Sequence, residues 1–450
     1  MSVPDDEVMA ATHTVAVVAE RPLQERFHAA RAQTERLLQN LSAEDCALPS
    51  RPASSPVKCH LAHTTRFFET HVLQALIPRQ QPFHPQFCSL FDACNARAQR
   101  GVLSRPSLEA VMAYRCHRNA RIAAMLDAGA PAAWPMAELG VPHEQRHQEL
   151  ILADLQHLFS CNRLQPVYAP APCAAEPAPV LYKWLAQPDG VQRIGHEGGG
   201  FCFEHELPRH RIFLEAYAIA LRPVGNREYA DFIANSGYTR QEFWLAESWE
   251  LDNAEGWQAP LYGQREGAAW LAFGLHRLCA PAAAAPVCHV SYFEADAYAR
   301  WAGTRLPSEA EWECFAAQQP LAGPFLEDGV FEPQPASTVA ATQIMAMCGN
   351  RRTALASPIP GIVWRKGSQP HTVKNSSRIN TCCAVDRASL HAPISARTTV
   401  IPPRLPNAGS SAASVWPATL TETVLGAVLR SLSACQNDWL CSGRKLQFSL

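Results

Sequence analysis

The sequence predicts a two-domain protein of class α + (α+β), in which a four-helix bundle precedes a domain of short strands and helices. Residues 20–164 contain four segments with apolar residues at helical spacing, separated by Pro-rich breaks such as SRPASSP. Residues 165–180 form a Pro/Ala-rich linker. After the linker the pattern changes to short strands, turns such as HEGGGF, and two short helices. Four helices joined by short breaks are typical of a bundle that can host a metal site.

The expected elements follow this division. Residues 1–19 form an N-terminal tail, and residues 181–343 form the second domain. The periodic segments predict helices at Leu23–Leu41, Val57–Leu76, Ser107–Leu126 and His143–Phe159 in the bundle, and at Asn226–Ser236 and Ser291–Ala302 in the second domain.

Composition excludes several classes of protein. A chain of 450 residues can bury two or three cores, and 47% hydrophobic with 18% charged residues is typical of a globular protein. A net charge of -2 gives no general attraction to nucleic acid. No apolar run reaches the roughly 20 residues that span a membrane. The acidic N-terminus favours a cytoplasmic location, where the 16 scattered cysteines would be reduced. Nothing in the sequence indicates the oligomeric state.

The segment HEQRH predicts a metal site. His143 and His147 are four residues apart, so they share one face of a helix and can chelate one ion. His63, on the predicted second helix of the bundle, can add a third imidazole. We interpret its neighbour His60 as a surface residue, with a supporting role behind the ligands as the alternative. Neutral imidazoles suit iron, zinc and copper alike.

HEQRH also matches the zinc-hydrolase signature H-E-x-x-H, in which Glu144 would be the general base. The longer pattern H-E-x-x-H-x-x-G-x-x-H does not follow it. A zinc hydrolase and a metal-binding protein without activity remain alternatives at this point.

Two groups of motifs resemble the sulfoxide synthases of ergothioneine biosynthesis. SPVKCHLAHTTRFFET and HEQRHQEL resemble their N-terminal DinB-like domain. PRHRIFLEAYAIALRPVGNREYADFI and APVCHVSYFEADAYARWAGTRLPSEAEWE resemble their C-type-lectin-like domain of the formylglycine-generating-enzyme (sulfatase-modifying-factor) type. The resemblance covers residues 20–343.

The resemblance implies a non-haem Fe(II) enzyme that uses O2 to join a thiol to C2 of hercynine, giving a sulfoxide. It implies His63, His143 and His147 as the iron ligands. It places Arg97 and Arg100 where arginines bind the carboxylates of the thiol donor, which is γ-glutamylcysteine or cysteine. An ovothiol-type synthase, which joins cysteine to histidine, is a related alternative. We expect small-molecule substrates, with no nucleic-acid or membrane partner, and the catalytic acid is not identified.

The chain departs from the family near the site. The family usually has tryptophan at the positions of Cys59 and Arg66, and commonly has glutamine at the position of Arg146. Each of these changes can arise from one base substitution. Arg146 adds a positive charge beside a predicted ligand. These departures leave the three histidines in place but favour an inactive relative as an alternative.

The larger departure begins near Ile344. Residues 344–450 contain 12 Lys/Arg and 3 Asp/Glu, a balance of +9, whereas the first 343 residues hold the other 27 and 38, a balance of -11. In a shifted frame, the codons of IMAMCGN permit the family stretch YGDVWE, and those from Arg378 to Arg387 permit NQYVLRGGS. The sequence therefore predicts an out-of-frame tail without a packed core and an incomplete second domain.

Overall fold

The computed structural model describes residues 21–52, 54–77, 81–91, 103–129, 133–170, 183–198, 202–203, 206–267, 269–319, 325–335, 350–351 and 397–398. All of these lie in the first of the two compact units of the chain, Met1–Leu405.

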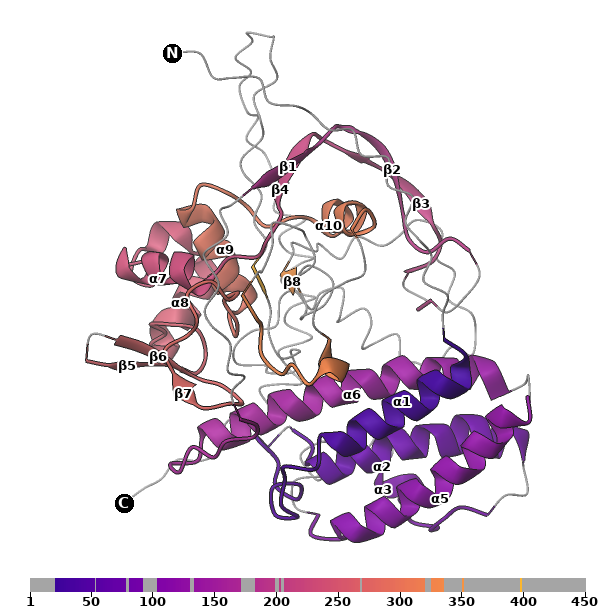
Figure 1. Cartoon of the computed structure of the whole chain (residues 1–450). Helices are drawn as coiled ribbons and strands as arrows, with labels where there is room; N and C mark the ends of the chain where they lie inside the picture. Colours follow the sequence, from indigo (N-terminus) through magenta and orange to yellow (C-terminus); the bar gives the residue numbers. More distant parts are fainter. Residues whose placement is uncertain are drawn as a thin grey trace, which may run out of the picture. The chain divides into compact units, whose positions relative to one another are not determined.

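Four helices form the predicted bundle: α1 (Leu23–Arg36), α2 (Val57–Phe68), α5 (Leu108–Asp127) and α6 (Trp134–Ser160). α1 packs on α5 and α6, and α2 packs on the same two helices (Figure 1). Apolar side chains from several helices meet in the core, among them Phe27, Phe68, Ile122 and Ala137. The bundle is thus held by faces that the helical spacing of the sequence predicts.

The helix that starts at Val57 changes its winding part of the way along. Residues Glu69–Gln74 form a π-helical segment that continues α2. Glu69 is fully buried there, 2.5 Å from Nη2 of Arg118, and accepts a hydrogen bond from the Tyr114 hydroxyl. This wider turn follows directly on the stretch that contains His60 and His63.

α6 begins nine residues before the predicted start at His143. The added turns contain Pro142, although proline usually disrupts a helix interior. This part of α6 approaches α2 so closely that a Cβ at Gly140 would clash with the Phe68 ring. The short helix α3 (Phe87–Leu90) was also not predicted.

The second domain contains small antiparallel sheets. β1 (Trp184–Gln187) pairs with β4 (Tyr217–Ala220), with Leu185 opposite Ile219, and β2 (Gly190–Ile194) pairs with β3 (His210–Leu214). The third sheet has the order β5-β6-β7, and its strands are Gly263–Glu266, Ala269–Phe273 and Leu278–Cys279.

Helices accompany these sheets. The two predicted helices are α7 (Asn226–Ala234) and α9 (Tyr292–Trp301), while α8 (Ala246–Glu255) and α10 (Glu309–Ala316) were missed. α9 starts as its sequence predicts, because Ser291 and Glu294 form a capping box. Short 3-10 turns lie at Gln241–Phe243 and Leu326–Asp328. The α+β class of the second domain is confirmed.

The bundle contacts the second domain directly. Phe273 and Leu275 belong to the same apolar cluster as Leu155 and Phe159 of α6. The Gln156 side chain donates to the Phe273 carbonyl over 2.9 Å. Tyr168 and Ala169, in the predicted linker, are buried, and the Tyr168 hydroxyl donates to the Leu37 carbonyl over 2.9 Å. The first part of the linker is therefore anchored rather than a free spacer, and residues 171–180 lie outside the described residues.

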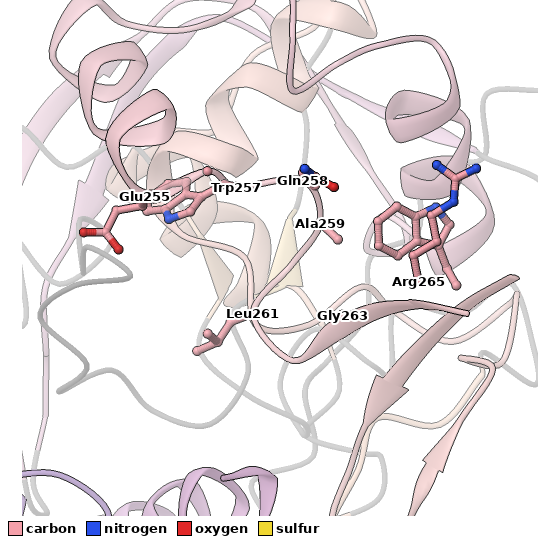
Figure 2. Close-up of a pocket in the computed structure, with 9 residues that line it drawn as sticks. Glu255, Trp257, Gln258, Ala259, Leu261, Gly263 and Arg265 are labelled. Atoms are coloured by element: carbon pink, nitrogen blue, oxygen red, sulfur yellow. The ribbon is translucent and has the colours of Figure 1, made fainter. Parts of the chain in front are cut away.

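A cleft of about 410 Å³ opens beside β5 and β6 (Figure 2). Glu255, Trp257 and Arg265 line it, together with Trp270. Its lining includes none of the predicted metal ligands.

The predicted out-of-frame tail falls almost wholly outside the described residues. Within it, β8 (Asn350–Arg351) pairs in parallel with β9 (Arg397–Thr398). The expectation that residues 344–450 lack a packed core therefore stays a prediction.

Candidate metal centre

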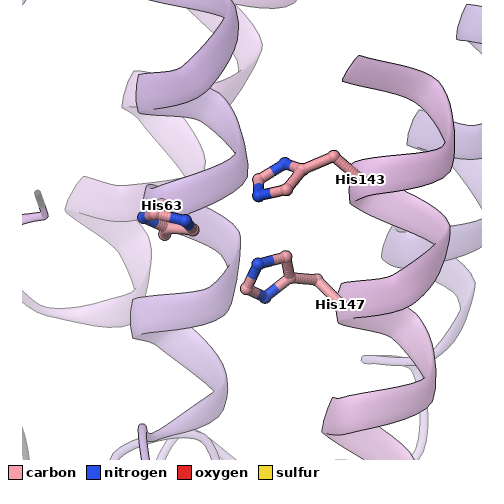
Figure 3. Close-up of side chains that lie close together, drawn as sticks. All are labelled: His63, His143 and His147. Atoms are coloured by element: carbon pink, nitrogen blue, oxygen red, sulfur yellow. The ribbon is translucent and has the colours of Figure 1, made fainter. Parts of the chain in front are cut away.

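The three predicted ligands meet between two helices. His63 projects from α2, and His143 and His147 project from successive turns of α6 toward it (Figure 3). One ring nitrogen from each lies within 4.8 Å of the others. The ring centres of His143 and His147 are 4.7 Å apart, and that of His63 lies 5.3 and 5.0 Å from them. This spacing lets one ion contact all three imidazoles after small side-chain movements.

Burial keeps two of these imidazoles neutral. It lowers the pKa of His143 from 6.5 to about 3, with a further contribution from His63, and it lowers the pKa of His147 well below 6.5. Nδ1 of His143 is buried and has no hydrogen-bond partner among the described residues. Neutral imidazole is the form that binds a metal, and an unpartnered buried nitrogen is costly unless something occupies it. The site therefore fits a metal ion.

The backbone fixes the ring of His63. Its Nδ1 atom lies 2.9 Å from the Phe91 carbonyl oxygen. A carbonyl can only accept, so Nδ1 carries the hydrogen and Nε2 keeps its lone pair. Such contacts hold metal-binding histidines in one tautomer and orientation.

His60 corrects one interpretation from the sequence. It is buried rather than on the surface, and its Nδ1 atom lies 2.8 Å from Nδ1 of His147. His60 precedes His63 by three residues on the same helix, and this spacing was the available signal. We call His60, His63, His143 and His147 the imidazole cluster.

Glu144 belongs to a different set of contacts. Its fully buried carboxylate accepts from Arg31, from Nη2 of Arg115 over 2.6 Å and from the Thr34 hydroxyl over 2.7 Å. Burial alone would raise the pKa of Glu144, but Arg115 and Arg31 lower it to about 2. We call Arg31, Thr34, Arg115 and Glu144 the arginine–carboxylate cluster. A carboxylate held in this way is a poor general base, which argues against the zinc-hydrolase alternative.

Other side chains shape the surroundings of the imidazoles. The Phe67 ring stacks on His143, with ring centres 4.7 Å apart, and forms an apolar wall. Arg146 is partly buried. Burial and the neighbouring imidazoles lower the pKa of His143 and His147 most, and the charge of Arg146 lowers it further. Cys59 is buried in the apolar core. Nε of Arg66 donates to the Cys88 carbonyl over 3.1 Å.

Arg97 and Arg100 lie outside the described residues, so their predicted contact with a substrate stays a prediction. In the described part of the chain, no helix combines the length and the apolar character needed to cross a membrane.

Comparison with known proteins matches both halves of the chain. Residues 26–159 match the DinB superfamily, and residues 183–342 match the sulfatase-modifying factor enzyme 1-like domain. The chain is 32% identical over 302 residues to the hercynine oxygenase of Mycobacterium tuberculosis, covering 65% of this chain and 69% of the relative. It is 30% identical over 313 residues to the hercynine oxygenase of Mycolicibacterium smegmatis, covering 68% and 71%. It is 35% identical over 176 residues to the formylglycine-generating enzyme of Streptomyces coelicolor, covering 35% and 55%.

Proposed function

The chain belongs to the hercynine oxygenase family, and from this premise we propose that it is an Fe(II)- and O2-dependent sulfoxide synthase of ergothioneine biosynthesis. It would join the thiol of γ-glutamylcysteine or cysteine to C2 of hercynine. One oxygen atom of O2 ends in the sulfoxide, and the other leaves as water with the hydrogens of the S–H and C–H bonds.

The observation that carries this proposal is the set of three imidazoles. His63, His143 and His147 bring one nitrogen each within 4.8 Å of the others, on a bundle followed by the second domain of the family. The lowered pKa of His143, caused mainly by burial, keeps its ring ready for a metal at neutral pH. Fe(II) held by these rings would supply the redox chemistry that couples O2 to carbon–sulfur bond formation.

The protein side chains have separate tasks in this proposal. Phe91 orients His63 through its carbonyl, so the Nε2 lone pair faces away from the backbone. Phe67 covers one face of His143 and limits the access of water there. Glu144 is held by two arginines, so its role is to support the bundle and not to transfer protons. Arg97 and Arg100 would bind the carboxylates of the thiol donor, as the family resemblance implies.

The test is a reconstituted reaction with the full chain. Metal-free protein is first loaded with Fe(II) under anaerobic conditions. It is then mixed with hercynine, with γ-glutamylcysteine or cysteine, and with O2. We expect a sulfoxide in the mass spectrum, no product with a chelator, and none from His63→Ala. Histidine in place of hercynine tests the ovothiol-type alternative. Tightly bound zinc together with peptidase activity would overturn the proposal.

A second candidate is an inactive metal-binding member of the family. It is favoured by the reversal of charge after residue 343, and the match to the second domain ends at residue 342. We propose that the chain from about residue 344 is translated out of frame. Resequencing the gene around the codon of Ile344 tests this directly: one inserted or deleted base restores YGDVWE, and a confirmed reading frame refutes it.

A further inference from the structure

His60 lies between a predicted metal ligand and a buried carboxylate. Its Nδ1 atom is 2.8 Å from Nδ1 of His147, and its Nε2 atom is 3.5 Å from Oδ2 of Asp154. The Nε2 atom is buried, and although 3.5 Å is too long for a well-formed hydrogen bond, the Asp154 carboxylate is the charged group that it faces. The three side chains thus form a row that leads from α6 through α2 and back to α6.

Asp154 is itself held in place. Its Oδ1 atom accepts from the hydroxyls of Ser50 over 2.6 Å and Ser54 over 2.9 Å. Burial alone would raise the pKa of Asp154, but His60 and the two hydroxyls lower it, so the carboxylate stays ionised. An ionised carboxylate can only accept hydrogen bonds.

This acceptor sets the direction of the whole row. The Asp154 carboxylate favours a His60 ring with its hydrogen on Nε2, the nitrogen that faces the negative charge, and Nδ1 of that ring then accepts. Nδ1 of His147 must then donate, which leaves the lone pair on Nε2 of His147. That tautomer can bind a metal through Nε2.

We propose that His60 and Asp154 are positioning residues that hold His147 in its metal-binding tautomer. This inference rests on the proposed function for its role in the reaction, but not for its test. A backbone carbonyl fixes the tautomer of His63, whereas the tautomer of His147 depends on two side chains that mutation can change. Outer residues of this kind typically contribute on the order of 10- to 100-fold to metal affinity.

Asp154→Asn is the sharpest variant, because it keeps the shape of the side chain. With its oxygen toward the two serines, its amide would donate to Nε2 of His60. His60 would then donate to Nδ1 of His147, and the hydrogen of His147 would move to Nε2. His60→Phe removes the acceptor, whereas His60→Gln offers an amide oxygen in its place. His276→Gln is the matched control, since His276 is also buried but bonds to the Ala169 carbonyl instead.

Two measurements on the full-length chain test the proposal. The first is Co(II) titration of metal-free protein, followed by the visible absorption of the bound ion. The second is nitrogen NMR of metal-free protein labelled at histidine, which distinguishes the two tautomers. Thermal unfolding identifies any variant that fails to fold.

We expect Asp154→Asn and His60→Phe to weaken Co(II) binding about 10- to 100-fold. Asp154→Asn should also move the His147 hydrogen to Nε2, while His60→Gln and His276→Gln keep wild-type behaviour. Wild-type affinity and an unchanged tautomer in Asp154→Asn would overturn the proposal. If the wild-type chain makes no sulfoxide while Asp154→Asn still shows the tautomer change, the proposed function alone is refuted.

Discussion

Two polar clusters lie inside the same bundle, and they differ in how their polar atoms are satisfied. In the arginine–carboxylate cluster, the carboxylate of Glu144 has donors from Arg31, Arg115 and Thr34. In the imidazole cluster the rings of His143 and His147 are neutral, and Nδ1 of His143 is without a partner among the described residues. The first arrangement stabilises the fold, and the second is suited to a cation from outside.

The two clusters share one turn of α6. His143 and Glu144 are neighbours in sequence, yet their side chains leave the helix in different directions and meet different partners. The comparison shows that a polar residue inside a bundle is assigned to stability or to binding by the groups that the other helices bring to it.

The largest effect is expected from Glu144→Gln. This change removes the buried carboxylate that Arg31 and Arg115 share, although Arg115 keeps its ion pair with Glu35. We therefore expect a loss of about 3–5 kcal/mol in the free energy of unfolding. Chemical denaturation of the metal-free protein measures it. Glu44→Gln, at an exposed position, is the control and should change stability by less than about 0.5 kcal/mol. A fully stable Glu144→Gln would show that the cluster does not hold the bundle together.

The second prediction concerns the imidazole cluster. His143→Ala should weaken Co(II) binding by more than the roughly 100-fold upper value for an outer residue, because it removes one of three ligands. The metal-free protein should lose much less stability than Glu144→Gln does. Titration and denaturation of the same samples give both numbers. Unchanged metal affinity in His143→Ala would remove His143 from the ligand set.

Acid should affect the two clusters in different pH ranges. Burial lowers the pKa of His143 to about 3, below the unfolded value of 6.5, so its contribution is present above pH 6.5 and is lost as the pH falls toward 3. Burial alone would raise the pKa of Glu144, but Arg115 and Arg31 outweigh it and lower the pKa from 4.5 to about 2. The contribution of Glu144 to stability is therefore lost only below about pH 4.5. Each group changes stability by at most about 1.4 kcal/mol per pH unit.

Denaturation of metal-free protein between pH 8 and pH 4 measures this dependence. His143→Gln should flatten the curve between pH 6.5 and 4.5, whereas Glu144→Gln should leave that range unchanged. The same slope in both variants would contradict the assignment of separate roles.

The smallest effect is expected from Thr34→Val. It removes one of the donors to Glu144 but leaves both arginines, so we expect a loss of about 1.5 kcal/mol. Metal affinity should be unchanged, because the Thr34 hydroxyl bonds to Glu144 and not to the imidazole cluster. A loss as large as that of Glu144→Gln would mean that the hydroxyl, and not the charge pairing, holds the carboxylate.

By itself, the sequence determined the helical segments of the bundle, the two-domain order and the histidines that could share one ion. These features depend on local spacing: apolar residues recur with the period of a helix, and residues four apart lie on one face. The four-residue spacing of His143 and His147 was therefore enough to pair them, and His63 joined them as the imidazole of a second helix.

Tertiary packing decided the rest. Glu144 matched a catalytic base in sequence, but Arg31 and Arg115, on α1 and α5, hold it in the core. The sequence favoured a surface position for His60, but in the structure His60 is buried and α6 places His147 against it. The sequence placed the start of this helix at His143, whereas α6 begins at Trp134 and packs against α2 where Gly140 meets Phe68. In each case the deciding partner is distant in the chain, and local spacing holds no information about partners that only packing brings together.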